Sequence, residues 1–208
     1  MNNNINTFNL WAKNGRDEKM ERNHTDAVNR MIDIINDETS KLDQPFKFLD
    51  LGCGNGWVVR MMGQHNNCKY SMGIDGAKNM IKKAKSYNIG NFEEADIESY
   101  YYKSKFDIIF SIETLYYIND INQLFHTLYN KGLKNHGIFI IGIDHYKENI
   151  PSLNWEEEYN LTINTLSIDE WHDLFLSHGF RNIKIYQHGK NNDWQGTLIL
   201  IGTKIEKK

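Results

Sequence analysis

Three glycines stand at alternate positions in the stretch FLDLGCGNGW, at Gly52, Gly54 and Gly56. They directly follow residues 46–51, an apolar run with the length and composition of a buried strand. Glycine lets a ligand approach the backbone closely and tolerates positive φ, so the loop suits ligand binding at the end of a strand. A tight turn into the next helix, without any ligand, would use the same residues.

Carboxylates end the next two apolar segments of the chain. Asp75 ends SMGID and precedes Gly76, while Asp96 ends FEEAD and precedes Ile97. The first carboxylate is placed to accept hydrogen bonds from a ribose diol. The second is placed to accept from the exocyclic amine of adenine, with Ile97 packed against the ring. Each aspartate alone is more often a helix cap or a solvated turn, but the three features together favour a nucleoside site.

The elements that must position these residues alternate regularly. Five apolar or β-branched segments are separated by amphipathic ones, which is typical of a parallel sheet with helices on both faces. We expect strands at 46–51, 70–74, 91–96, 106–112 and 138–143, and helices at 20–39, 57–63, 77–87 and 121–133. Ligands bind such sheets at the carboxyl ends of the strands, so the glycine loop and both aspartates should share one edge.

The pattern changes after the fifth strand. Residues 145–166 show little periodicity and predict a long loop or a cap on the substrate side. Ser167 and Glu170 have the spacing of a capping box, and the helix that they open should end at Gly179. Two last strands, at 182–187 and 196–203, are expected to form an antiparallel hairpin.

The expected fold is therefore α/β, a doubly wound, mostly parallel seven-stranded sheet with an antiparallel C-terminal hairpin and helices on both faces. We expect one domain over residues 1–208, in which residues 1–40 form an N-terminal segment and helix ahead of the first strand. The first five to ten residues are expected to be frayed.

Composition narrows the class of protein. The chain has 208 residues, of which 40% are hydrophobic, and a formal net charge of −3, so nothing favours nucleic acid or an anionic membrane as a partner. Its apolar runs are strand-sized and its first residues lack the layout of a signal peptide, which predicts a soluble, cytoplasmic protein. Cys53 and Cys68 form neither a disulfide framework nor a CxxC pair, and no metal site is expected.

Four motifs carry a resemblance to a known family. LDLGCGNG, GID, EADIE and FDIIFSIETLYYI, in this order and at these intervals, resemble the class I S-adenosylmethionine-dependent methyltransferases of the small-molecule type. The similarity covers roughly residues 46–143, and the C-terminal helix and hairpin also resemble that fold. The resemblance implies S-adenosylmethionine as cofactor and a small-molecule methyl acceptor.

The resemblance also implies roles for particular residues. Asp50 and the loop Gly52, Cys53, Gly54, Asn55 and Gly56 would hold the methionine part of the cofactor. Asp75 and Gly76 would meet the ribose, Asp96 and Ile97 the adenine, and residues 111–113 (Ser111, Ile112, Glu113) the far wall beside the sulfonium. The N-terminal segment resembles the lid of small-molecule members, with Trp11 as a candidate cofactor contact. Trp11 as a plain anchor of the segment is the alternative.

Methyl transfer from a sulfonium needs alignment more than acid or base chemistry. Aromatic faces stabilise the cation, and Tyr116, Tyr117 and Trp11 are candidates, although ordinary packing explains them as well. Where a base is needed, Glu113, His145 and Tyr146 are the candidates, because they follow the fourth and fifth strands; His24 is a weaker one. His145 is expected at the rim of the crevice.

The same segments disfavour several other activities. Trp57 stands where a dinucleotide fingerprint has its third glycine, which disfavours a nicotinamide enzyme. SIETLYYI stands in place of an Asn-Pro-Pro-Tyr loop, which disfavours amino methylation of adenine or glutamine. No cysteine follows Cys68, which disfavours a pyrimidine methyltransferase with a cysteine nucleophile and an arsenite methyltransferase with several cysteines. A catalytically silent cofactor-binding protein remains the alternative from another class. Neither the acceptor nor the oligomeric state can be read from the sequence.

Overall fold

A computed structural model describes residues 3–205 of the chain. Its helices and strands follow one another in the order α1 (Asn3–Asn14), α2 (Arg16–Glu38), β1 (Phe46–Leu51), α3 (Trp57–Gly63), β2 (Cys68–Asp75), α4 (Lys78–Ser86), β3 (Asn91–Glu94), β4 (Phe106–Ile112), the 3-10 turn η1 (Leu115–Tyr117), α5 (Ile121–Thr127), the π turn η2 (Leu128–Gly132), β5 (Leu133–Ile143), the 3-10 turn η3 (Ile150–Ser152), α6 (Trp155–Tyr159), α7 (Ile168–Ser177), β6 (Phe180–His188) and β7 (Thr197–Lys204).

The seven strands form one sheet in the order β3-β2-β1-β4-β5-β7-β6. β1 to β5 pair in parallel, and β7 is antiparallel to both β5 and β6. The predicted α/β class, strand number and C-terminal hairpin are confirmed. The strand order reverses between β1 and β4, and this is the point where such sheets bind ligands.

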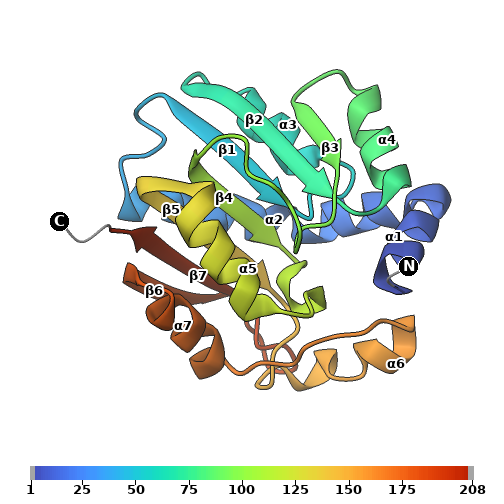
Figure 1. Cartoon of the computed structure of the whole chain (residues 1–208). Helices are drawn as coiled ribbons and strands as arrows, with labels where there is room; N and C mark the ends of the chain where they lie inside the picture. The colour runs from blue at the N-terminus through green and yellow to red at the C-terminus, as the bar shows by residue number, and fades with distance from the viewer. Residues whose placement is uncertain (1–2, 206–208) are drawn as a thin grey trace.

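Two apolar layers hold the helices against the sheet. Along β5, Ile138 and Ile140 belong to the cluster that packs against α2, while Phe139 and Ile141 belong to the cluster with Phe175 of α7. This alternation is what a strand buried on both faces requires, because successive side chains point to opposite faces. The sheet is therefore covered on both sides (Figure 1).

Some boundaries differ from the prediction. β3 ends at Glu94, so Asp96 lies in the following loop. The predicted helix 121–133 is divided into α5 and η2, and β5 begins at Leu133, which pairs with Phe106. The capping box of α7 is confirmed, since the Ser167 hydroxyl accepts from the Glu170 N–H and the Glu170 carboxylate accepts from the Ser167 N–H.

The N-terminus differs most. The expectation of five to ten frayed residues is wrong for the described part, because α1 begins at Asn3; residues 1 and 2 lie outside the described residues. α1 lies beside α4, at the end of the sheet toward which β2 points (Figure 1). The N-terminal segment is therefore an ordered part of the edge that was predicted to bind a ligand.

Candidate cofactor and acceptor site

An open cavity, partly continuous with solvent, lies at the carboxyl ends of β1, β2 and β4. Backbone, carboxylate and apolar groups all line it, which is typical of small-molecule sites. Ten of the fourteen residues predicted to bind the cofactor line it, namely Asp50, Gly52, Cys53, Gly54, Asn55, Asp75, Gly76, Asp96, Ile97 and Ile112. The carboxyl ends of the strands bring them together.

The glycine loop is built as a backbone wall. Gly52 and Gly54 have φ values of +75° and +52°, in the left-handed region that favours glycine. A Cβ at Gly52 would collide with the Thr114 side chain, whereas a Cβ at Gly54 would meet no atom of the described chain within 4 Å. Gly52 thus allows close packing against the loop after β4, and Gly54 leaves the backbone open to the cavity.

Asp75 ties the glycine loop to the end of β2. Its Oδ2 accepts from the Gly54 N–H at 2.9 Å, and its Oδ1 accepts from the Ala77 N–H at 2.7 Å. Burial raises the pKa of this carboxyl in spite of the two N–H donors. Each oxygen keeps a further lone pair, so the carboxylate is able to accept from a vicinal diol while it orders the loop.

Asp50 is buried next to the loop, with 1% of its surface exposed. Its Oδ1 has no hydrogen-bond partner among residues 3–205. Burial, and then the charge of Asp75, raise the pKa of Asp50 well above its usual range. A buried carboxylate without a partner is costly, and an ammonium group in the cavity would supply the missing donor. The site therefore fits the amino-acid end of S-adenosylmethionine.

The loop after β3 forms the next part of the wall. Asp96 lines the cavity and accepts from the Glu98 N–H through Oδ1, and Ile97 presents an apolar surface beside it. Across from them, the Ile5 side chain of α1 lies 2.9 Å from the position that a Cβ at Gly76 would take. Glycine at position 76 therefore lets α1 close on the end of β2.

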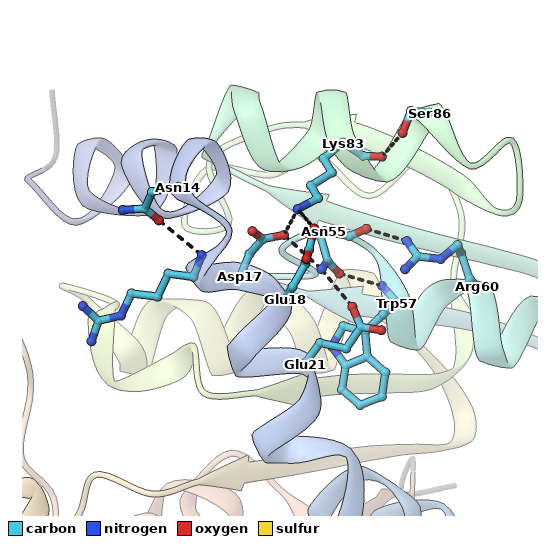
Figure 2. Close-up of polar contacts among 10 residues, drawn as sticks. Asn14, Asp17, Glu18, Glu21, Asn55, Trp57, Arg60, Lys83 and Ser86 are labelled. Atoms are coloured by element: carbon cyan, nitrogen blue, oxygen red, sulfur yellow. Dashed lines mark hydrogen bonds and ion pairs between the residues drawn. The ribbon is translucent and has the colours of Figure 1, made fainter.

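α2 is fixed to the glycine loop by a polar network (Figure 2). The Asn55 amide donates to Asp17 Oδ2 at 3.1 Å and to Glu21 Oε2 at 3.0 Å. Lys83 of α4 lies 2.8 Å from the same Asp17 oxygen and 2.7 Å from Glu18. Asp17, Glu21 and Asn55 all line the cavity, so the start of α2 is part of its wall.

α1 is tied down at two points. The side chain of Asn4 pairs with the backbone of Thr162, donating to its carbonyl and accepting from its N–H, each at 2.8 Å. Asn9 accepts twice from Asn79 of α4, through its side-chain oxygen from the backbone N–H at 2.8 Å and through its carbonyl oxygen from the side-chain amide at 3.2 Å. The helix thus links the β2 side of the cavity to the segment at 145–166, and its Asn4, Ile5 and Phe8 line the cavity.

Four predicted cofactor residues do not line the cavity. Ser111 is buried and donates to the Leu51 carbonyl, Gly56 caps the start of α3, and Tyr116 donates to Glu113. Trp11 is 8% exposed and packs against Phe8 and Tyr159, with the Arg16 guanidinium 4.1 Å from its ring centre. The structure thus places these four behind the wall, where they support residues that face the cavity.

The predicted catalytic residues separate into two groups. Glu113 lines the cavity, but His145 is only 1% exposed and does not lie at its rim. Its two ring nitrogens lie 2.9 Å from the Ser152 carbonyl and 2.8 Å from the Thr165 hydroxyl. Tyr146 is equally buried and donates to the Gly196 carbonyl. Both residues order the segment that follows β5.

Glu113 belongs to a cluster that the sequence did not reveal. His24 of α2, Glu113 and Asp144 come together, with His24 Nε2 3.4 Å from Asp144 Oδ2 and 3.9 Å from Glu113 Oε2. Burial and the charge of Asp144 raise the pKa of Glu113 to about 8. Burial lowers the pKa of His24, but the hydrogen bond to Asp144 and the two carboxylate charges outweigh it and raise this pKa to about 9. Asp144 directly follows β5, so the rule that selected His145 and Tyr146 would have found it one residue earlier.

The comparisons with known proteins agree with this geometry. Residues 17–185 match the family described as methyltransferase domain, so the chain belongs to that family. It is a class I S-adenosylmethionine-dependent methyltransferase domain, as the motifs predict, and S-adenosylmethionine is its cofactor.

Two curated relatives illustrate the range of the family. The malonyl-[acyl-carrier protein] O-methyltransferase of Calditerrivibrio nitroreducens is 30% identical over 138 residues, which are 66% of this chain and 53% of that protein. The ubiquinone biosynthesis O-methyltransferase of Pelagibacter ubique is 26% identical over 176 residues, 71% of each chain. The chain spans about half the length of the first of these.

Solved structures share the fold. A chain in the complex between the Haloferax volcanii Trm112 methyltransferase activator and a methyltransferase has a TM-score of 0.80 at 22% identity, covering 96% of this chain and 98% of that one. The DhpI–SAH complex has a TM-score of 0.72 at 12% identity, covering 98% and 96%. At these identities the likeness concerns the fold. Within the described residues, no helix is long and apolar enough to cross a membrane.

Proposed function

We propose that this chain transfers a methyl group from S-adenosylmethionine to an oxygen, nitrogen or carbon nucleophile of a small molecule. The observation that carries the proposal is the shared wall of the cavity. Asp50, Asp75 and the glycine loop form a site for the cofactor, and the same cavity continues to Glu113 and His24. We therefore place donor and acceptor in this one cavity.

The protein's part in this reaction is mainly alignment. When bound, the cofactor supplies an electrophilic methyl group on a sulfonium. Asp50 would hold its ammonium, Asp75 its ribose diol, and Asp96 with Ile97 its adenine. Good alignment of two reactants can be equivalent to an effective molarity of about 10⁵ to 10⁸ M, so no further catalytic group is required by the transfer itself.

α1 and α2 cover one side of this space. Ile5, Phe8 and Met20 give the cavity apolar surface on the side of the lid, and Tyr117 lies 5.1 Å from Phe8 between ring centres. Aromatic faces beside a sulfonium stabilise it by roughly 0.5 to 2 kcal/mol. We place the acceptor between this aromatic pair and Glu113, which is the predicted catalytic residue that lines the cavity. Catalytic roles for His145 and Tyr146 would have to be indirect.

The relatives indicate the kind of acceptor. Their names describe O-methylation of malonyl-[acyl-carrier protein] and of a ubiquinone precursor, and N-methylation of phosphoethanolamine in Arabidopsis thaliana. We therefore propose a small acceptor, or the small end of a carrier-bound one. A cytoplasmic location and the lack of a nucleic-acid partner remain predictions from composition.

The test is incubation of the full chain with methyl-labelled S-adenosylmethionine and a metabolite extract. We expect label in a small-molecule product, and we expect the folded Asp75→Ala variant at the same cofactor concentration to lose most of it. Cofactor binding without transfer to any compound would instead identify a silent binding protein and overturn the proposal.

A further inference from the structure

Three side chains from distant parts of the sequence meet beside the cavity. His24 comes from α2, Glu113 from the turn after β4 and Asp144 from the end of β5. One ligand atom from each lies within 4.8 Å of the other two. His24 and Glu113 also line the cavity. A nitrogen and two carboxylate oxygens therefore converge next to the place proposed for the methyl acceptor.

The orientation of His24 is fixed from its other side. Its Nδ1 lies 2.8 Å from the Met20 carbonyl oxygen, which only accepts, so this contact assigns the proton to Nδ1. The proton that a metal ion would displace is therefore the one on Nε2, and Nε2 is the atom that faces both carboxylates. An N–H donated to a backbone carbonyl is the arrangement that commonly orients metal-bound histidine.

Glu113 is held just as firmly. Its Oε1 accepts from the Asp144 N–H at 2.6 Å, and its Oε2 accepts from the Tyr116 hydroxyl at 2.7 Å. The residue has φ of +54°, in the left-handed region that a glutamate seldom adopts. Strain of this kind persists where the surroundings over-determine a conformation, and it is frequent at functional sites. The carboxylate is thus oriented before any ligand arrives.

Asp144 has one carboxylate oxygen that its neighbours leave unsatisfied. The residue is 8% exposed, and its Oδ1 is without a hydrogen-bond partner in the described part of the chain. A simple His24–Asp144 ion pair explains the 3.4 Å contact, but it leaves the buried Asp144 Oδ1 unexplained.

We propose that His24, Glu113 and Asp144 bind one divalent transition-metal ion, of the Mn²⁺ or Zn²⁺ class, with an open coordination position toward the cavity. Ligand atoms about 2.0 to 2.2 Å from such an ion lie roughly 3 to 3.5 Å apart. The separations of 3.4 and 3.9 Å therefore need only small side-chain rotations. One imidazole with two carboxylates favours these ions over Ca²⁺ and Mg²⁺, which prefer oxygen ligands alone.

The open position defines a ligand class for the site. It takes a small molecule with an oxygen or nitrogen donor, which the ion orients and makes more acidic. In that role Glu113 acts as a metal ligand instead of a free base. Metal binding itself does not depend on the proposed methyl transfer.

The test is titration of the full, cofactor-free chain with MnCl₂, followed by calorimetry and by the loss of the free Mn²⁺ spectrum in electron paramagnetic resonance. We expect one ion per chain, displaced by ZnCl₂. His24→Ala and Asp144→Asn should each weaken Mn²⁺ binding at least tenfold. His188→Ala is the matched control, because His188 pairs with Asp26 at 2.7 Å on the exposed surface, and this variant should bind Mn²⁺ like the parent.

A second variant protects the test against misfolding. Tyr116→Phe keeps all three ligands and removes only the hydroxyl that orients Glu113, so it should fold and bind Mn²⁺ more weakly than the parent. A folded parent that binds neither ion at millimolar concentration would overturn the proposal, as would unchanged affinity in both ligand variants. S-adenosylmethionine binding measured on the same samples separates either failure from a failure of the proposed function.

Discussion

Asp50 combines nearly complete burial with a carboxylate oxygen that has no partner within residues 3–205. Such a group lowers the stability of the cofactor-free protein, because burying it removes water that nothing replaces. It is useful only if a cation arrives. Asp50 is therefore expected to lower the stability of the free protein and to strengthen cofactor binding.

Asp50→Asn should accordingly stabilise the free protein and weaken the cofactor. We expect a melting temperature a few degrees higher and S-adenosylmethionine affinity at least tenfold lower, because the charged partner of the ammonium is gone. Differential scanning fluorimetry and calorimetry measure the two effects. Asp43→Asn, at an exposed loop carboxylate, should change neither. A variant that binds the cofactor as tightly as the parent would contradict the role of Asp50.

The raised pKa of Asp50 also predicts a pH dependence. Between the ordinary carboxyl value of 3.8 and the raised value, the folded state holds a proton that the unfolded state releases. The contribution of Asp50 to the free energy of unfolding therefore falls as pH rises through this window. Urea unfolding of the parent and of Asp50→Asn at a series of pH values should show a stability difference that grows in favour of the variant above pH 4. A stability difference that stays constant over this pH range would contradict the raised pKa of Asp50.

Asp75 has a double role, since it accepts from the backbone of Gly54 and is proposed to accept from the ribose. Hydrogen bonds to a charged acceptor contribute roughly 1.5 to 3 kcal/mol each. Asp75→Ala should weaken S-adenosylmethionine binding by at least about tenfold while circular dichroism shows a folded protein. The affinity of that folded variant, measured by calorimetry, decides the assignment: parental affinity would exclude it.

For single residues, the sequence predicted those at the strand ends better than it predicted which other side chains lie close to them. Asp75 and Asp96 were recognisable because the carboxyl ends of parallel strands meet at one edge, and Asp50 was recognisable through the family resemblance. His24 was only a weak candidate, because its distance to Glu113 depends on how α2 crosses the sheet. His145 and Asp144 are neighbours in the chain, and only the backbone direction at the end of β5 decides which of them approaches the cluster.

Among the elements, the strands of the sheet could be predicted from the pattern of apolar residues, whereas α1 could not. Runs such as 138–143 are apolar on both faces and of strand length, so their burial is encoded locally. Residues 3–14 carry four asparagines after Asn3 and only a short apolar face, formed by Ile5, Phe8 and Trp11. Their helix depends instead on tertiary contacts such as Asn4 with Thr162 and Asn9 with Asn79. A helix this short is marginal in water without such contacts.

Removing α1 should therefore affect the cofactor more than the sheet. Deletion of residues 1–15 leaves α2 complete with Asp17 and Glu21, whereas a deletion to residue 19 would cut into α2. We expect a folded protein whose cofactor dissociates at least tenfold faster, because Ile5 and Phe8 no longer cover the cavity. Stopped-flow displacement measures that rate. If the deletion variant releases the cofactor at the parental rate, α1 is not a lid.

For the whole molecule, the fold and the glycine spacing together select the cofactor. Trp57, the first residue of α3, lines the cavity at the position where a dinucleotide fold has a third glycine for close packing of the helix on the strand. We expect S-adenosylmethionine to stabilise the protein by about 2.7 kcal/mol at one hundred times its dissociation constant, and NAD to leave the melting temperature unchanged at the same concentration. A larger thermal shift with NAD would contradict the assignment.

The link between Asn4 and Thr162 joins residues that are 158 positions apart. A ribosome that adds about 5 to 20 residues per second exposes α1 roughly 8 to 30 s before its partner exists. During that interval the nascent chain has a free amphipathic N-terminus and an incomplete cofactor site. Competence to bind the cofactor is therefore acquired late in translation, and chains that terminate early, before residue 162, leave the ribosome without a closed site.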